Sequence, residues 1–260
     1  MKVRRLDPFW LVLGLITGTY LLFWVGLLGA TAAHSSPHDL WRALAAREIR
    51  HAVGLSLVTC SLTAALSLFL AVPVGYLLAR ARFPGWVWLD AAMDIPIVLP
   101  PMVVGLCLLI FFQTAAGQLL ERVIPFTYTV AGVVLAQFVI GAAFAVRTMR
   151  GTFEHLSSRP EDVALTLGCT RAQAVWRVTL PAARRGMYAA ASIAWARSLG
   201  EFGPILVFAG ATRMKTEVLP TSVWLELSVG NLEAAIAVSL LMVSLATAVL
   251  AGVRLMGERL

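Results

Sequence analysis

The sequence predicts an all-α, polytopic membrane protein, and three observations lead to this fold class. Of its 260 residues, 59% are hydrophobic and only 13% are charged, whereas about 25% of residues are charged in a typical soluble domain. Six apolar windows, each about as long as the 20 residues that cross a bilayer, follow one another along the chain. The basic residues lie mainly in alternate connections between these windows, as the positive-inside rule requires.

The six predicted spans lie near residues 9–29, 53–79, 88–112, 128–146, 187–209 and 232–253. The third window is longer than a crossing needs and contains Pro96, Pro100 and Pro101, so we expect it to kink or to begin as a short interfacial piece. The first window follows a basic start and ends in small residues. Cleavage as a signal peptide is therefore an alternative to an anchoring span.

The distribution of basic residues predicts the orientation of the chain. With the N-terminus inside, the cytoplasmic segments carry 14 basic residues and the outer segments carry six. The inner set includes Lys2, Arg4, Arg5, Arg254 and Arg259 at the two ends of the chain. Both termini are therefore expected in the cytoplasm, and the net charge of +7 reflects topology rather than nucleic-acid binding.

Residues 148–185 form the one long hydrophilic segment, between the fourth and fifth spans. Pro160, Glu161 and Asp162 are typical of a first helical turn, where acidic side chains favour the helix dipole. Gly168 is typical of a helix end. The segment is thus expected to contain a short helix followed by a glycine turn.

A second helix is expected to begin at Thr170, which has a glutamine at capping-box spacing, and to end at Pro181. On the first helix, Val163, Ala164 and Leu167 share a face. That small apolar face either inserts into a groove on another protein or rests on the inner surface of this one.

At these residues the chain resembles the permease subunits of binding-protein-dependent ABC importers. The family pattern is E-A-A, three residues, glycine, nine residues and I-x-L-P, and every spacing agrees. The residues at these positions are Asp162, Val163, Ala164, Gly168, Val178, Leu180 and Pro181, with Asp for Glu, Val for the first Ala and Val for Ile as conservative departures. The stretches "IVLPPMVVG", "ARSLGEFGPILVFAG" and "KTEVLPTSVW" are similar to permeases that import molybdate, tungstate and, more distantly, sulfate.

The resemblance implies the type I ABC importer permease fold, with six transmembrane helices and a cytoplasmic coupling-helix loop. It implies a single domain over residues 1–260. Its parts would be an N-terminal anchor span and outer loop (1–48), a permease core (49–254) and, within the core, the coupling loop (148–185). Contacts that couple the chain to an ATPase are implied for Glu161, Asp162, Val163, Ala164, Leu167, Gly168, Leu180 and Pro181.

The resemblance also implies partners. A homodimer of this chain in the cell membrane would work with two cytoplasmic ATPase subunits and an extracytoplasmic binding protein that delivers the oxyanion. The sequence contains no G-x-x-x-x-G-K-[ST] phosphate loop, so ATP and Mg are expected on the ATPase subunit. We expect no catalytic residue, cofactor, metal or nucleic acid on this chain itself.

Arg197 and Glu201 lie four residues apart in the fifth predicted span, where ionised side chains are costly unless paired or hydrated. Their spacing allows them to pair on one helical face. Either the pair only fixes helix packing, or it borders the translocation path at the dimer axis, where glycines allow close approach and proline loosens the backbone. The predicted path and gate comprise Arg197, Ser198, Gly200, Glu201, Gly203 and Pro204.

Two further groups of charged residues allow alternatives. Asp90 and Asp94 share a helical face near the cytoplasm, where they serve as interfacial caps or as a proton relay. Arg213, Lys215 and Glu217 are expected either to face the docked binding protein, where rim charges steer encounter, or to be ordinary solvated loop residues.

Other functions remain as alternatives. A secondary ion-coupled transporter also uses intramembrane charges, but it would need inverted repeats, and none is found in the sequence. A membrane-bound enzyme would need a metal or nucleophile constellation. Permeases for phosphate or amino acids share the loop pattern, so the oxyanion is a finer prediction than the class of transporter.

Overall fold

The computed structural model describes residues 8–34 and 36–258, and within them the regular structure is helical. The helices are α1 (Pro8–Ala33), α2 (Pro37–Ala45), α3 (Arg47–Arg80), α4 (Trp86–Val98), α5 (Pro101–Gln113), α6 (Ala115–Val123), α7 (Val130–His155), α8 (Arg159–Thr166), α9 (Arg171–Ala174), α10 (Leu180–Leu199), α11 (Leu219–Ser228) and α12 (Leu232–Glu258). Two π-helical turns, η1 (Val175–Thr179) and η2 (Ile205–Ala209), flank α10. The all-α prediction is confirmed.

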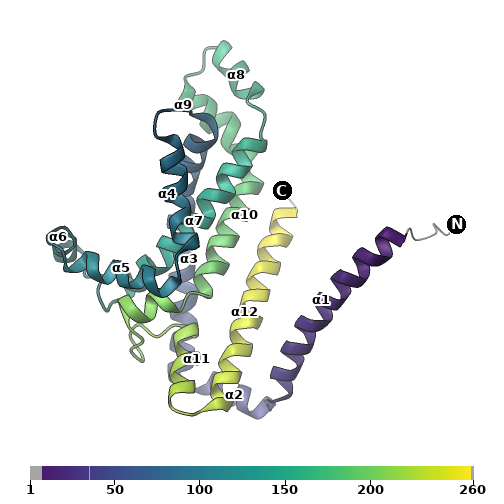
Figure 1. Cartoon of the computed structure of the whole chain (residues 1–260), viewed down its shortest axis with the longest axis vertical. Helices are drawn as coiled ribbons and strands as arrows, with labels where there is room; N and C mark the ends of the chain where they lie inside the picture. Colours follow the sequence, from purple (N-terminus) through teal and green to yellow (C-terminus); the bar gives the residue numbers. More distant parts are fainter. Residues whose placement is uncertain (1–7, 35, 259–260) are drawn as a thin grey trace.

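The centre of the molecule is a bundle of α3, α7 and α10 (Figure 1). Helix α3 turns a face of small side chains inward, including Ser56, Cys60, Ala64 and Ala71. At Gly75 a Cβ atom would lie 2.8 Å from the Cβ of Met149 on α7, so only glycine permits this crossing. In a bilayer the lipid is as apolar as the side chains, so the hydrophobic effect does not drive helices together. Small residues stabilise the bundle instead, because they allow close packing of the helices.

The third predicted span is a sharply bent pair of helices, α4 and α5, whose axes differ by 111°. The residue before a proline is driven to extended backbone, and Leu99 adopts φ −65° and ψ 139° immediately before Pro100. Pro101 then begins α5. The expected kink is therefore present, and α5 leaves the bundle sideways while α4 runs along it (Figure 1).

The fifth predicted span needs correction, because residues 187–209 do not form one helix. Helix α10 starts earlier, at Leu180, and ends at Leu199, and the chain then breaks before the π-turn η2. Among the described residues, four helices are long and apolar enough to cross a membrane, or five if α4 and α5 count as one span. These are α1, α3, α7 and α12; α10 carries three arginines within 20 residues and is not among them.

The predicted cytoplasmic loop, residues 148–185, is almost entirely helical. Helix α7 extends into it as far as His155, and α8, α9 and η1 fill the rest before α10. Pro181 does not end a helix, contrary to the expectation, but lies in the first turn of α10. In the preceding π-turn the Leu180 N–H bonds to the Val175 carbonyl. This turn is wider than an α-turn, and the chain continues as a helix through Pro181.

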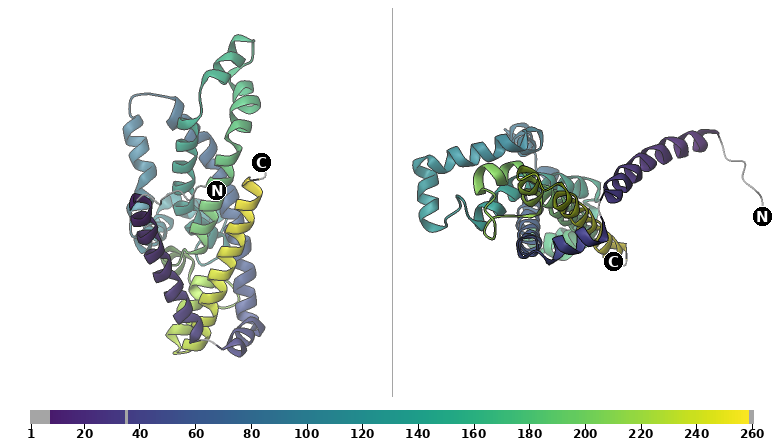
Figure 2. Two further views of the ribbon diagram at one scale, coloured as in Figure 1. Left: turned by 90° about the vertical axis from the view of Figure 1, so that its right-hand side faces the viewer. Right: turned by 90° about the horizontal axis from the view of Figure 1, so that it is seen from below.

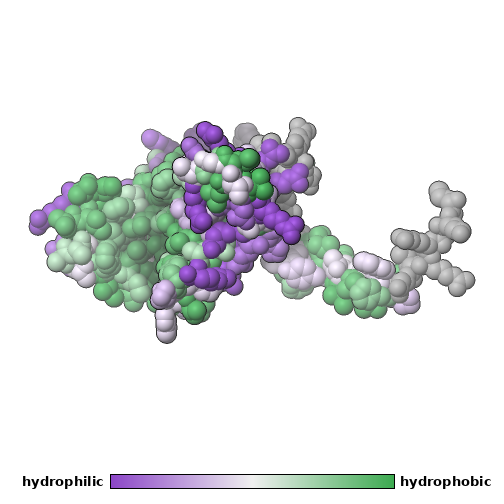
Figure 3. All heavy atoms as spheres, turned by 90° about the horizontal axis from the view of Figure 1, so that it is seen from above, coloured by the Kyte–Doolittle hydropathy of each residue, from purple (hydrophilic) through white to green (hydrophobic). Residues whose placement is uncertain are grey.

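Helix α1 stands apart from the bundle in Figure 1 and in the right-hand view of Figure 2. None of its apolar span is buried within the structure. Seen from the α8 end, hydrophilic side chains gather around the tip of the molecule, while apolar surface covers the parts that extend to either side (Figure 3). This distribution fits a body embedded in lipid with one polar end.

Candidate functional site

The helix α8 forms the tip of the molecule (Figure 1). It ends at Gly168, whose φ of +91° is a left-handed conformation that favours glycine. The Cys169 N–H bonds to the Ala164 carbonyl and the Gly168 N–H to the Leu165 carbonyl, each at 3.0 Å, which is the Schellman arrangement. The predicted glycine stop is confirmed, and so is the capping box between Thr170 and Gln173 that starts α9.

The apolar residues of α8 do not share one face, contrary to the prediction. Ala164 is buried against the protein itself, whereas Val163 and Leu167 are 55% and 80% exposed. Successive residues of a helix point about 100° apart, so neighbours such as Val163 and Ala164 can be divided between two faces. The exposed face, completed by Asp162, is the one that another protein can reach.

Glu161 also points inward, although the resemblance implied that it contacts a partner. Only 8% of the residue is exposed. Its Oε1 accepts a hydrogen bond from Tyr76 on α3 at 2.5 Å, and its Oε2 accepts one from Thr179 in η1 at 2.9 Å. Tyr76 lies 85 positions away in the chain, so no local pattern could have identified the pair.

The π-turn adds an exposed aromatic side chain that the sequence did not single out. Trp176 is 73% exposed and lines an apolar hollow beside α3. Of the remaining predicted coupling residues, Leu180 is half-buried and Pro181 is exposed. We call the two exposed side chains Val163 and Leu167 the tip patch.

The break after α10 contains the predicted ion pair. The Arg197 Nη2 lies 3.1 Å from the Glu201 Oε2, so the predicted pairing is confirmed. Glu201 is 1% exposed and Arg197 is half-buried, with its guanidinium carbon 5.7 Å from the centre of the Phe144 ring. The positive member of the pair is thus the more accessible one.

Ser198 is buried and bonds to its own helix, because its Oγ donates to the Ala194 carbonyl at 2.7 Å. Its carbonyl accepts hydrogen bonds from the Glu201 N–H and, at 3.2 Å, from the Gln137 Nε2 on α7. Gln137 therefore holds the turn that carries Glu201. The sequence analysis missed Gln137; a lone amide in an apolar span was the available signal.

The segment after the break packs directly on α5. A Cβ atom at Gly203 would lie 2.9 Å from the Met102 Cγ, and one at Gly105 would lie 2.7 Å from the Pro204 Cα. Gly203 therefore lies close to α5, whereas at Gly200 the nearest atoms are carbonyls of its own turn at 3.9 Å and beyond. The close approach expected at a dimer axis concerns a second copy of the chain and stays a prediction.

At the opposite end of the molecule, the loop after η2 carries charged residues. The Arg213 Nη2 donates to the Glu226 Oε1 at 2.8 Å, and this hydrogen bond raises the pKa of the Arg213 guanidinium. Glu217 is fully buried and accepts a hydrogen bond from Ser222, so the expectation that it faces the outside is wrong. A polar hollow of about 250 Å³ lies beside Arg213, between α2 and the start of α12.

The two aspartates of α4 form ion pairs with α7: Asp90 pairs with Arg150, and Asp94 with Arg147. Arg150 also bonds to Glu154 at 2.9 Å. These contacts hold α4 against α7, so the aspartates act between helices rather than as caps.

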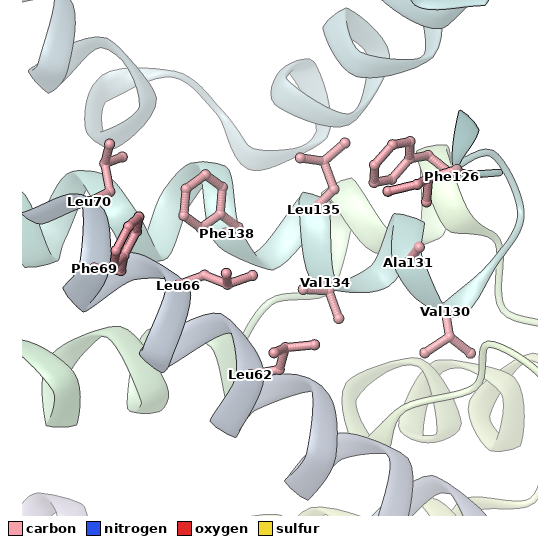
Figure 4. Close-up of a pocket in the computed structure, with 11 residues that line it drawn as sticks. Leu62, Leu66, Phe69, Leu70, Phe126, Val130, Ala131, Val134, Leu135 and Phe138 are labelled. Atoms are coloured by element: carbon pink, nitrogen blue, oxygen red, sulfur yellow. The ribbon is translucent and has the colours of Figure 1, made fainter. Parts of the chain in front are cut away.

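Two apolar hollows lie on the sides of the bundle. The one in Figure 4 has a volume of about 540 Å³ and lies between α3 and α7, lined by side chains such as Leu66, Phe69 and Phe138. A second, of about 810 Å³, lies between α3, η1 and α10. Because their lining is apolar, both suit lipid or another apolar helix rather than an anion.

The family profile described as "Binding-protein-dependent transport system inner membrane component" matches residues 71–260. The chain belongs to this family. The matched region contains α8, the break after α10 and most of the bundle.

Relatives within the family extend the similarity over nearly the whole chain. The molybdenum transport system permease protein of Mycobacterium bovis is 35% identical over 249 residues, which are 95% of this chain and 93% of that protein. The sulfate transport system permease protein of Escherichia coli is 32% identical over 242 residues, covering 91% and 87%. The names of these two relatives refer to the transport of molybdenum and of sulfate.

The fold matches that of a chain in a solved ABC transporter structure. A bacterial ABC transporter involved in the import of the acidic polysaccharide alginate contains a chain with a TM-score of 0.76, 15% sequence identity and 96% coverage of both chains. At this identity the likeness concerns the fold, which is that of a type I ABC importer permease.

Proposed function

We propose that this permease forms the membrane path of an ATP-driven importer for molybdate or tungstate. The observation that carries the proposal is the similarity to a molybdenum permease over 95% of the chain, which includes both α8 and the break after α10. Sulfate is a second candidate, because a sulfate permease is similar over 91% of the chain. All three anions are tetrahedral dianions, so one path can suit any of them.

The tip patch supports docking of a separate ATPase subunit at α8. Val163 and Leu167 expose apolar surface at the polar end of the molecule, and exposed apolar side chains rimmed by polar ones mark protein interfaces. In this proposal the ATPase holds ATP and Mg, and this chain holds no cofactor. An extracytoplasmic binding protein would deliver the anion at the end that carries Arg213.

The ion pair at the break supports a path for anions. Because Arg197 is more exposed than Glu201, an entering anion meets the positive side chain first. The buried carboxylate keeps the net charge of the pair close to zero, so the pair binds the anion only weakly. Conduction requires binding that is weak enough for the anion to leave. Selectivity then belongs mainly to the binding protein.

The exposed helix α1 supports assembly with a second copy of the chain. A helix with none of its apolar span buried can add contacts only to lipid or to another chain. A homodimer would provide those contacts and would place two breaks around one axis.

The arrangement of the ends supports the predicted orientation. The start of α1 and the end of α12 point toward the end that carries α8, while α2 and the α11–α12 turn lie at the other end (Figure 1). A cytoplasmic α8 would then place both termini in the cytoplasm. Lys2, Arg4, Arg5 and Arg259 lie outside the described residues, and the side chain of Arg254 is not described either.

Uptake into proteoliposomes tests the proposal. The permease would be reconstituted with its ATPase and binding protein, and uptake of radiolabelled molybdate would be measured with unlabelled tungstate or sulfate as competitors. We expect uptake that needs ATP and that tungstate suppresses more strongly than sulfate does. Stronger suppression by sulfate would reassign the substrate, and equal uptake without the ATPase would overturn the importer.

A further inference from the structure

The carboxylate of Glu161 is buried, although the helix that carries it lies at the surface of the molecule. Helix α8 is short and lies at the tip of the molecule, and the neighbouring Asp162 is exposed. Asp162 can therefore supply the favourable charge near the helix N-terminus. Burial of a second carboxylate is costly unless its oxygens are hydrogen-bonded, and both oxygens of Glu161 accept a hydroxyl hydrogen bond.

The two hydroxyl donors come from different elements of the bundle. Tyr76 lies in the last turn and a half of α3, and its ring packs edge-on against Phe153 of α7 at 5.5 Å between centroids. Thr179 is the last residue of the π-turn that leads into α10. The Glu161 carboxylate thus joins α8 to α3 and to the π-turn that precedes α10.

The contact with Thr179 lies at the end of the π-turn η1. A π-turn is rare and is most often found as a bulge at a functional site. In η1 the bulge lies just before Pro181, which cannot donate a backbone hydrogen bond. Thr179 therefore adjoins the start of α10, the helix whose other end carries Arg197.

We propose that Glu161 is a positioning residue that passes displacement of α8 to α3 and α10. This inference rests on the proposed function and assigns different roles to the two sides of α8. The outward side of α8, with Val163 and Leu167, contacts the ATPase, while the inward side, with Glu161, moves the bundle. The two sides can be altered separately.

The first test removes the two hydroxyl groups with little change in size. In the reconstituted complex, Tyr76→Phe, Thr179→Val and the double variant should bind the ATPase as the wild type does. We expect the double variant to import about fivefold to tenfold fewer anions per ATP hydrolysed, because charge-assisted hydrogen bonds are among the stronger ones. Tyr188→Phe and Thr166→Val are matched controls that leave Glu161 untouched and should keep the wild-type ratio.

A second measurement separates transmission from a merely structural role. Spin labels at Thr166 on α8 and at Ile193 on α10, in a background without the three native cysteines, report the two helices separately. On ATP binding, both label distances across the dimer should change in the wild type. In the double variant the α8 distance should still change, while the α10 change should be lost or much reduced.

The outcomes distinguish this inference from the proposed function. Wild-type coupling and wild-type movement of α10 in the double variant would overturn the role of Glu161 and leave the importer intact. Leu167→Asp should abolish co-purification of the ATPase, and unchanged co-purification would overturn docking at the tip patch. If the double variant assembles poorly, the single variants decide, because each removes only one hydroxyl.

Discussion

At the scale of single residues, the ion pair at the break is asymmetric. Glu201 is almost fully buried, while Arg197 keeps part of its side chain exposed. Removing the exposed arginine would leave an uncompensated buried charge, whereas removing the glutamate leaves an arginine that can reach water. The cost of breaking a buried pair depends on which member is left behind.

This asymmetry gives a prediction for stability. Arg197→Leu should destabilise the permease by about 3 kcal/mol, the order found when one partner of a buried pair is removed, and Glu201→Gln should cost clearly less. The measurement is thermal unfolding of the purified permease in detergent. The double variant Arg197→Leu/Glu201→Leu should recover much of the loss, and an Arg197→Leu variant that unfolds like the wild type would contradict a charged Glu201.

A second prediction at this scale concerns the end of α8. Gly168→Ala should destabilise the helix end by about 1 kcal/mol, because a Cβ atom is disfavoured at positive φ. Gly168→Asn should cost less, since asparagine tolerates the left-handed conformation. The measurements are co-purification of the ATPase and transport by each variant. If both variants match the wild type in both measurements, this helix cap does not limit coupling.

At the scale of elements, the sequence predicted the features that depend on local chemistry. The glycine stop of α8, the capping box at Thr170 and the kink near Pro100 all follow from backbone preferences of the residues themselves. The inward position of Glu161 and the role of Gln137 could not be predicted in this way. Their partners lie 18 to 85 positions away, and only the packing of α3, α7 and α10 brings them together.

The prediction of where α10 ends was also wrong, and the reason is physical. The apolar composition of residues 187–209 fits a single span, yet Gly200, Gly203 and Pro204 favour a break that allows the chain to contact α5. Hydropathy measures transfer into lipid and does not register this contact. The same limitation applies to α10. This helix contains three arginines and is too polar to be identified as a span by hydropathy, yet it packs in the centre of the bundle.

Gln137 provides the prediction at this scale. Gln137→Leu should change the anion-to-ATP ratio, because the Ser198 carbonyl loses its side-chain donor and the turn with Glu201 loosens. Transport and ATPase rates of the reconstituted complex measure this ratio. Gln118→Leu, on the exposed helix α6, is a matched control, and an unchanged ratio for Gln137→Leu would mean that the turn is held by other contacts.

At the scale of the whole molecule, the structure has a polar tip at α8 and a second end formed by α2 and the α11–α12 turn (Figures 1 and 3). The proposed orientation places these ends on opposite sides of the bilayer. Trp41 on α2 is 74% exposed and Leu167 at the tip is 80% exposed, so both positions can report topology.

The orientation is tested with a membrane-impermeant thiol reagent in intact cells. In a background without native cysteines, Trp41→Cys should be labelled from outside, and Leu167→Cys should be labelled only after the membrane is permeabilised. The reverse pattern would invert the chain in the membrane and would separate α8 from any cytoplasmic ATPase.

The sharp corner between α4 and α5 links two distant parts of the chain. Two consecutive prolines restrict rotation at the corner, one arm is tied to α7 through Asp90 and Asp94, and the other touches Pro204 at Gly105 without an intervening side chain. The corner therefore connects α7 to the segment beyond the break. Since Asp94 and Arg147 are partly exposed and open to screening by ions, a higher salt concentration on that side of the membrane is expected to loosen the contact of this arm with α7.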